Sequence, residues 1–359
     1  MVRDRRHLLL GVVAIAFVAI GATRPPPTVQ AARAQQPGPL PISAAAPAPR
    51  FARDLDARVF LRGNLHAHSS RSDGDKTPRE VYAWYREHGY AFLALTDHNK
   101  RVDPTQFRAE ERPGFVILPG EEVSTIAAGL PVHVNALCAR RGIGGKDFPS
   151  TPAALSWAIA RVHEEGGIAL VNHPNFSWAI RGADLPAARG AELLEIYSGH
   201  PGVHTAGNAT RPSHEALWSA ALAEGETFAG VAVDDTHHFS KKHIGRFASK
   251  PGRGWVSVYG AELAAPSICE ALRRGDLVAS SGPELDRLVV EGDELRVVPR
   301  ASARVEFLGP GDAALADVRV AAGEPATYRL RGGERFVRAR LTDAAGKQAW
   351  TQPMRVAQR

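Results

Sequence analysis

The chain has 359 residues, of which 44% are hydrophobic, so length and composition suggest one large domain with a real core plus a smaller satellite. Its net charge of +6 would suit a nucleic-acid partner. However, residues 1–35 contain five arginines and one aspartate, which is +4 of that charge, and only +2 remains on the rest. The charge therefore gives no reason to expect nucleic acid as a partner.

Residues 1–35 have the layout of an export signal: a basic start, an apolar stretch at Leu8–Ile20 and then small residues. The stretch is shorter than the roughly 18 residues that span a bilayer, so we expect a signal peptide, with an uncleaved anchor as the alternative. Arg5 and Arg6 also fit a twin-arginine signal. Residues 36–56, rich in Pro and Ala, predict a disordered linker. We expect a periplasmic or extracellular protein that touches a membrane only through its N-terminal segment.

From residue 57 onward, short apolar runs alternate with helical patterns, which is typical of a β/α repeat with parallel strands. The clearest helix start is "TPRE", where Thr77 is the N-cap, Pro78 follows it and Glu80 closes a capping box; this helix should end near Gly89. Further helices are expected at Thr151–Glu165, Ser213–Glu224 and Pro266–Arg274. Strands are expected at Val59–Leu61, Phe92–Leu95, Phe115–Leu118, Val132–Leu137, Ile168–Val171, Leu193–Tyr197, Val231–Val233 and Trp255–Tyr259.

Histidines and carboxylates follow most of these strands. In β/α barrels the loops after the strands meet on one face, so side chains far apart in sequence come together there. A lone histidine carries little weight, but the repetition of the pattern at successive strands predicts a metal site. The residues concerned are His66 and His68; Asp97 and His98; Glu121 and Glu122; Asn172 and His173; His200; and Asp234, Asp235, His237 and His238, with His133 inside a run.

Eight short segments resemble the PHP (polymerase and histidinol phosphatase) family of metal-dependent hydrolases, and within it an exported carbaryl-hydrolase-like branch. In chain order they are "NLHAHSSRSDG", "LTDHN", "PGEEVS", "HVNAL", "NHPN", "EIYSG", "VDDTHH" and "SSGP", between Phe60 and about Pro283. The first, second and seventh are the most specific. The resemblance implies an α/β fold for residues 57–284, a distorted (β/α)7 barrel that holds two or three divalent ions.

The same resemblance implies nine metal ligands, with Glu122 as a bridge between the first and second ions. The other ligands of the three ions are, in turn, His66, His68 and Asp235; His133 and His173; and Asp73, His98 and His237. Mixed imidazole and carboxylate ligands suit Zn, Mn or Fe. A hydroxide held between two such ions is a strong nucleophile near neutral pH, so no serine or cysteine nucleophile is needed.

Some neighbouring residues have more than one interpretation. Glu121 competes with Glu122, but adjacent side chains in an extended segment point to opposite sides, and the motif match favours Glu122. Asp97 and Asp234 could each orient a ligand. Asp234 and Ser198 stand where many relatives carry a small residue and an asparagine, and these departures affect the expected shape of the substrate pocket.

Four further residues are candidates for contacts with a small-molecule substrate. His200 and His238 lie beside ligand loops and could protonate a leaving group; the alternative is that they are solvated loop histidines. Lys242 and Arg246 lie in the basic run 241–253 and could bind a substrate phosphate or carboxylate. The alternative for that run is an exposed basic loop.

Residues 285–359 change character and predict a small β-sandwich, because short alternating runs are separated by Gly, Asp and Pro turns. The runs are Leu288–Val298, Ala303–Leu308, Val318–Val320, Thr327–Leu330 and Phe336–Leu341. The expected role is structural packing on the barrel, with carbohydrate or envelope binding as the alternative. Elsewhere, Cys138 and Cys269 are either buried thiols or one disulfide.

Together these features predict a metal-dependent hydrolase that acts on a small phosphate ester. The same centre would also suit a carbamate, ester or amide, where the hydroxide attacks a carbonyl carbon. A third hypothesis is a non-catalytic metal-binding envelope protein or a module that serves a polymerase. The intact ligand set and the export signal oppose this third hypothesis.

Overall fold

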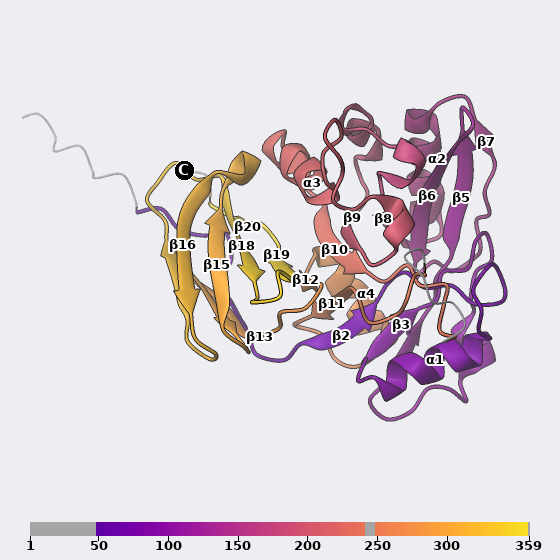
Figure 1. The fold of residues 1–359 in the computed structure, drawn as a ribbon, viewed down its shortest axis with the longest axis horizontal. Helices are drawn as coiled ribbons and strands as arrows, with labels where there is room; N and C mark the ends of the chain where they lie inside the picture. The colour runs from indigo at the N-terminus through magenta and orange to yellow at the C-terminus, as the bar shows by residue number, and fades with distance from the viewer. Residues whose placement is uncertain (1–47, 241–247, 358–359) are drawn as a thin grey trace, which may run out of the picture. The chain divides into compact units, whose positions relative to one another are not determined.

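The computed structural model describes residues 48–240 and 248–357 (Figure 1). The expected export signal at 1–35, most of the expected linker, and the candidate residues Lys242 and Arg246 lie outside the described residues. The described part has a mixed α/β fold, in which the four α-helices alternate with strands up to residue 284 and strands predominate beyond it. None of the described helices is long and apolar enough to cross a membrane.

The four expected helices are present close to their expected bounds. In α1, Pro78–Glu87, the capping box is formed: Glu80 N donates to Thr77 Oγ1 at 3.4 Å, and Thr77 N donates to Glu80 Oε2 at 2.9 Å. The other α-helices are α2 (Thr151–Glu164), α3 (His214–Ala223) and α4 (Ala265–Arg274). The 3-10 helices are η1 (Pro104–Phe107), η2 (Phe176–Trp178), η3 (Gly182–Ala188), η4 (Pro201–Val203) and η5 (Pro310–Asp312).

A six-stranded sheet carries half of the candidate site, in the order β10-β9-β8-β6-β5-β7. Its strands are β5 (Glu122–Ala127), β6 (Leu130–Leu137), β7 (Asp147–Phe148), β8 (Ile168–Val171), β9 (Leu193–Ser198) and β10 (Ala229–Val233). Strands β8, β9 and β10 are parallel, whereas β6 is antiparallel to both of its neighbours. Side chains of this sheet pack with α2 and α3 in one hydrophobic cluster.

A ten-stranded sheet carries the other half, in the order β16-β15-β18-β19-β12-β11-β2-β3-β4, with β20 beside β18. Strands β2 (Leu61–Asn64), β3 (Phe92–Ala94) and β4 (Val116–Leu118) are parallel. Strands β11 (Trp255–Val258) and β12 (Leu277–Ser280) continue it in antiparallel pairing. The remaining strands are β15 (Ala303–Leu308), β16 (Ala314–Val320), β18 (Phe336–Thr342), β19 (Gln348–Thr351) and β20 (Met354–Arg355).

The strands of residues 57–284 thus divide between two sheets, and strand pairing does not confirm the expected closed barrel. The two sheets are linked by isolated bridges, Ala67 with Thr236 and His98 with Glu122. One reason why the strands depart from a regular β/α barrel is the hairpin of β5 and β6, which interrupts the β/α repeat. Its turn residues Ala128 and Gly129 have φ of 50° and 83°, the left-handed pair that a tight two-residue hairpin turn requires.

The C-terminal strands form two layers around a shared core. A four-stranded sheet has the order β1-β13-β14-β17, from β1 (Leu55–Ala57), β13 (Leu285–Glu291), β14 (Glu294–Pro299) and β17 (Ala326–Arg329). Its apolar side chains cluster with those of β15, β18 and β19. The expected run Leu288–Val298 is therefore two strands with a turn at Gly292, where φ is 58°. Pairing of β12 with β19 makes the sheet continuous across residue 284.

The end of the segment expected to be a disordered linker has a fixed structure. Phe51 is buried in the C-terminal core, and β1 pairs with β13. The expected boundary at residue 56 is therefore wrong for residues 51–56, because a large apolar side chain and a strand edge are available there for burial and pairing.

Cys138 and Cys269 form a disulfide with a Cα–Cα distance of 6.3 Å. Of the two alternatives for these cysteines, buried thiols or one disulfide, the structure contains the disulfide. The bond joins the segment after β6 to α4, across 131 positions in the sequence.

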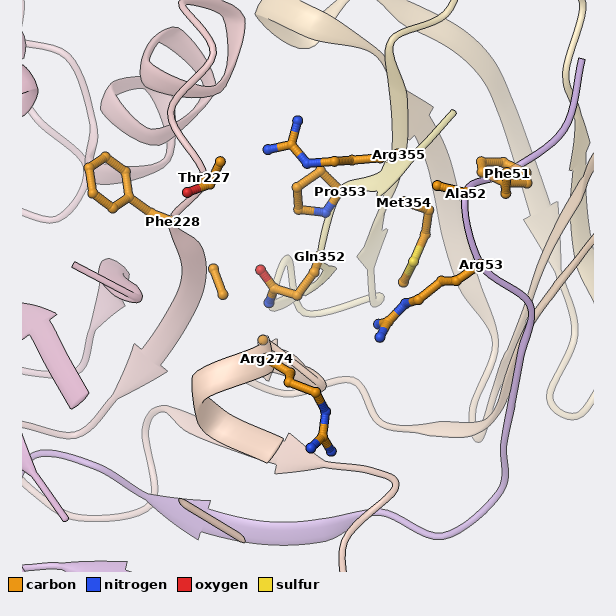
Figure 2. Close-up of a pocket in the computed structure, with 12 residues that line it drawn as sticks. Phe51, Ala52, Arg53, Thr227, Phe228, Arg274, Gln352, Pro353, Met354 and Arg355 are labelled. Carbon is orange, nitrogen blue, oxygen red and sulfur yellow. The ribbon is translucent and has the colours of Figure 1, made fainter. Parts of the chain in front are cut away.

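A cavity of about 370 Å³ lies among residues from the N-terminal side of β10, the end of α4 and β20 (Figure 2). Arg53 and Arg274 line it, and both donate to Asp276 at 2.7 Å, so their charges are already paired. No histidine, cysteine or carboxylate is among its described lining residues, so this cavity lacks the imidazole and carboxylate ligands expected of the metal site.

Candidate metal centre

The structure brings all nine predicted ligands together. They fall into four groups whose ligand atoms lie within 4.8 Å of one another. The groups are His66, His68 and Asp235; His66, Glu122 and His173; His98, Glu122 and His133; and His68, Asp73, His98 and His237. Most of these residues follow the parallel strands β2, β3, β8 and β10, whereas Glu122 begins β5 and His133 lies within β6.

Backbone hydrogen bonds hold the two most ligand-rich loops side by side. Asp235 N donates to the carbonyl of His66 at 3.0 Å, and His68 N donates to the carbonyl of Thr236 at 2.9 Å. Asp235 has a φ of 48°, a left-handed conformation that is uncommon for a non-glycine residue. Such strain is typical of residues whose side chains are held in place for function.

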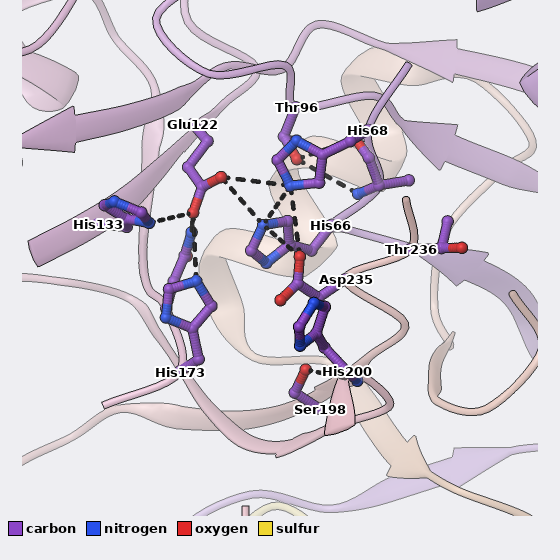
Figure 3. Close-up of polar contacts among 12 residues, drawn as sticks. His66, His68, Thr96, Glu122, His133, His173, Ser198, His200, Asp235 and Thr236 are labelled. Carbon is purple, nitrogen blue, oxygen red and sulfur yellow. Dashed lines mark hydrogen bonds and ion pairs between the residues drawn. The ribbon is translucent and has the colours of Figure 1, made fainter. Parts of the chain in front are cut away.

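The first group is buried and convergent (Figure 3). Nε2 of His66 and Nε2 of His68 are 3.1 Å apart, and Oδ1 of Asp235 lies 3.4 and 3.3 Å from them. Two imidazole nitrogens and a carboxylate oxygen that point at one another suit Zn, Mn or Fe.

Glu122 lies between the groups and is fully buried. Its Oε1 lies 2.9 Å from Nδ1 of His133 and 3.3 Å from Nε2 of His173, whereas its Oε2 lies 3.3 Å from Nε2 of both His66 and His68 (Figure 3). Nδ1 of His98 is nearer, at 2.9 Å from Oε2 and 2.6 Å from the Ser124 hydroxyl, but Oε2 has no partner with hydrogen-bond geometry. A buried carboxylate oxygen without a well-aligned hydrogen bond is costly, and a cation at that point would reduce the cost.

The group at the opening contains Asp73, His98 and His237. Oδ2 of Asp73 lies 3.5 Å from Nε2 of His98 and 3.3 Å from Nε2 of His237. Nδ1 of His68 also approaches Asp73, at 3.5 Å. Because a neutral imidazole has one lone pair available, His68 can serve only one of its two groups. The side chain of Asp73 is 51% exposed, which distinguishes this group from the buried ones.

The charges of the cluster depend on one another. Burial lowers the pKa of His66, but the carboxylates of Asp235, Glu122 and Glu195 outweigh burial and hold that pKa well above its ordinary value. Burial and the neighbouring His237 lower the pKa of His68 to about 4. Burial raises the pKa values of Glu122 and Asp235, but the surrounding imidazoles hold both well below the ordinary range. The two carboxylates therefore depend on nearby positive charge, which divalent cations would supply.

Three neighbouring carboxylates have structural contacts instead of the roles considered for them. Glu121 faces away from the cluster and accepts the amides of Ile143 and Gly144 at 2.8 and 2.7 Å. Asp97 accepts the amide of Ser69 and hydroxyls in the His66–Asp73 loop, rather than a bond from His98. Asp234 accepts the Tyr85 hydroxyl at 2.7 Å and backbone amides of residues 252–254. The contacts of Asp97 and Asp234 hold loops that carry ligands, whereas those of Glu121 hold the loop at residues 143–144.

Glu195 is a residue that sequence reasoning missed. Its carboxylate is fully buried in β9 and contacts Nδ1 of His66 at 2.6 Å. The signal available in the sequence was a single acidic residue in the middle of the apolar run "LLEIY". A charge in such a buried strand needs a polar partner, and this one has an imidazole.

A cavity of about 300 Å³ opens onto the cluster. It is lined by seven of the nine ligands and also by Phe176, His200, Val203 and His238. Nδ1 of His200 accepts the amide of Gly202 at 3.0 Å, and burial lowers the pKa of this histidine. His238 lies with its ring centroid 6.2 Å from that of His237. Both predicted leaving-group acids thus border the cavity.

Comparisons with known proteins give no family assignment. No protein-family model matches the chain, and no curated protein sequence matches it. Among solved structures, the chain is similar to a two-domain protein from Bacteroides vulgatus containing a predicted PHP-like metal-dependent phosphoesterase, at 16% identity and a TM-score of 0.46 over 82% of this chain and 92% of that one. It is also similar to an amidohydrolase from Chromobacterium violaceum with bound sulfate and no metal, at 18% identity and a TM-score of 0.39 over 59% of this chain and 96% of that one.

Proposed function

We propose that the chain is a metal-dependent hydrolase of the PHP barrel type, which cleaves a small phosphate ester with two or three divalent ions at this cluster. The observation that carries the proposal is the position of Glu122, whose two oxygens face different imidazoles while Oε2 has no partner with hydrogen-bond geometry. A carboxylate so placed suits a bridge between two cations at the roughly 3.5–4 Å separation of two-metal hydrolysis.

When bound, the ions would lower the pKa of a water molecule, supply it as the nucleophile and polarise the ester. The residues of the chain would position the reactants. Since Nδ1 of His200 accepts the Gly202 amide, the neutral ring carries its proton on Nε2, from which the leaving oxygen could receive it. Phe176 and Val203 would form an apolar wall for the organic part of the ester.

A carbamate, ester or amide is the second candidate substrate, and one observation favours it. Among the described residues that line the cavity, none is a lysine or arginine. A phosphate dianion commonly has such a partner, whereas a neutral acyl group does not need one. The same ligands would then activate water for attack on a carbonyl carbon.

Export to the periplasm or outside the cell is part of this proposal. The Cys138–Cys269 disulfide is consistent with an oxidising compartment. A twin-arginine route would export the protein already folded, with its metals loaded. The C-terminal strands would support the metal-binding part, because β19 pairs directly with β12.

The test is a hydrolysis assay of the purified protein with Mn or Zn, on nitrophenyl phosphate, bis-nitrophenyl phosphate and a naphthyl carbamate. We expect turnover of at least one phosphate ester. Turnover of the carbamate alone would replace the phosphoesterase proposal with the acyl alternative. Stoichiometric metal binding with no turnover of any of the three would favour the non-catalytic envelope protein.

A matched pair of variants ties the activity to the bridge. Glu122→Gln should lose activity, because the amide offers only one acceptor oxygen and no charge. Glu121→Gln makes the same change one residue earlier, on a buried side chain that faces the other way; it removes one acceptor for the amides of Ile143 and Gly144, so it should lower the melting temperature but retain the activity of the folded protein. Equal losses in the two variants would contradict the assignment of Glu122.

A further inference from the structure

Glu195 lies beside the cluster but belongs to none of its four ligand groups. Its side chain is fully buried in β9. Burial of an ionised carboxylate is costly unless the charge is paired and hydrogen-bonded. Among the described residues its ion pair is with the imidazole of His66 rather than with a lysine or arginine. The sheet therefore carries a charge whose partner is a predicted metal ligand.

The two oxygens of Glu195 hold two different ligands. Oε1 lies 2.6 Å from Nδ1 of His66, and Oε2 accepts the backbone amide of His173 at 2.8 Å. His66 belongs to the group with Asp235, whereas His173 belongs to a group with Glu122. One side chain thus fixes residues that are proposed to bind separate ions.

The contact with His66 also determines which ring nitrogen can bind a metal. A carboxylate accepts hydrogen bonds, so Nδ1 of His66 carries the proton. In the neutral ring the lone pair is then on Nε2, which lies 3.1 Å from Nε2 of His68 and 3.3 Å from Oε2 of Glu122. Figure 3 shows the rings of His66 and His173 turned toward Glu122. The ring is therefore oriented for coordination through Nε2.

We propose that Glu195 is the positioning residue of the metal centre: it holds His66 in the ligating tautomer and anchors the backbone of His173. This inference rests on the proposed function only through the metal centre. A glutamine cannot replace Glu195, because both contacts need an acceptor and an amide has a single acceptor oxygen. In Glu195→Gln either one of the two contacts is lost, or the side-chain NH₂ donates to Nδ1 of His66 and moves the ring proton to Nε2, the nitrogen proposed to bind metal.

The experiment measures metal affinity, by chelator competition with Zn or Mn, in the full chain and in two variants. Glu195→Gln should bind metal about 10–100-fold more weakly, the usual effect of removing a partner of a ligand. Glu192→Gln is the matched control. Glu192 also accepts an imidazole and a backbone amide, from His163 at 3.2 Å and Ala169 at 2.9 Å, but its histidine belongs to none of the ligand groups. This control should bind metal like the parent.

Affinity of Glu195→Gln within twofold of the parent, or equal losses in both variants, would overturn the proposal. If Glu195→Gln does not fold, ¹⁵N-histidine NMR of the Zn-loaded parent decides instead, with the His66 signal assigned by its loss in His66→Gln. Coordination through Nε2 with a proton on Nδ1 is the expected result, and coordination through Nδ1 would overturn it. A parent that binds metal but hydrolyses nothing would refute the proposed function and leave this inference standing.

Discussion

Removal of the Cys138–Cys269 disulfide should lower the melting temperature by a predictable amount. The bond closes a loop of 131 positions, which includes strands β8 to β11 and the ligands His173, Asp235 and His237. The chain-entropy relation for a loop of that length gives about 5 kcal/mol of stabilisation at 25 °C, through constraint of the unfolded chain. For a folded unit of roughly 300 residues, with an unfolding entropy of about 2.1 cal/mol/K per residue, this corresponds to roughly 8 °C.

The assay compares thermal unfolding of the parent with and without reductant, and of the double variant Cys138→Ser with Cys269→Ser. The reduced parent and the double variant should melt together, roughly 8 °C below the oxidised parent. Reductant should not change the melting temperature of the double variant, which is the control for nonspecific effects. Two titratable thiols in the unreduced, unfolded parent, or the same melting temperature with and without reductant, would refute the reasoning.

Three further predictions concern the site and its surroundings. Replacing His66 and His68 by Ala should abolish hydrolysis and reduce bound metal by at least about one ion per chain, with the circular dichroism spectrum retained; near-normal turnover would show that the site is assigned wrongly. Phe176→Ala should lower kcat/KM for an aromatic ester by roughly 5- to 30-fold, from the loss of about 1–2 kcal/mol of apolar contact, while metal content stays the same; an equal loss with a small alkyl phosphate would count against the apolar wall. His214 is fully buried, and burial lowers its pKa to about 3, so the unfolded chain takes up a proton below about pH 6.5 that the folded chain refuses. The free energy of unfolding therefore keeps the full contribution of neutral His214 above that pH, and it falls by up to about 1.4 kcal/mol per pH unit as the pH drops toward 3. In His214→Gln the free energy of unfolding should fall less steeply between pH 6.5 and 4.5 than in the parent. Identical slopes in the two proteins would contradict this.

Local signals in the sequence were sufficient for much of the fold. The α1 start follows from Thr77 and Glu80, which interact within one helical turn, and the structure contains both of their hydrogen bonds. The expected strand Ile168–Val171 is β8, since four consecutive apolar residues lie in a fully buried position. A structural element that depends on interactions between residues close in sequence can be predicted from composition and spacing.

Features that depend on distant partners were missed. Glu195 and His66 are 129 positions apart, so nothing near either residue indicates the contact. The pairing of β12 with β19 likewise joins strands that are separated by the whole C-terminal sandwich. The β5–β6 hairpin was missed for a local reason, because Ala128 occupies a left-handed turn position where asparagine or glycine is the usual indicator.

The motif resemblance supplied nine candidate ligands, and the structure brings all nine side chains together; that they bind metal stays a prediction. The assignment of each ligand to a particular ion was harder to predict from the sequence. His68 lies in two groups through its two ring nitrogens, and His66, His98 and Glu122 are also shared between groups. Such sharing follows from side-chain orientation in space, which spacing along the chain does not encode.

The exposure of Asp73 has a consequence for how the centre would exchange its metals. An ion held by Asp73, His98 and His237 would sit behind a carboxylate that is 51% exposed, whereas the ion at His66, His68 and Asp235 would be enclosed by buried side chains. A chelator reaches the first position directly, whereas at the second position His66 and His68 are fully buried and only the Asp235 carboxylate borders the cavity. The protein would therefore lose its outermost ion first and on a faster timescale, and the concentration of free metal around it would set the fraction of fully loaded molecules.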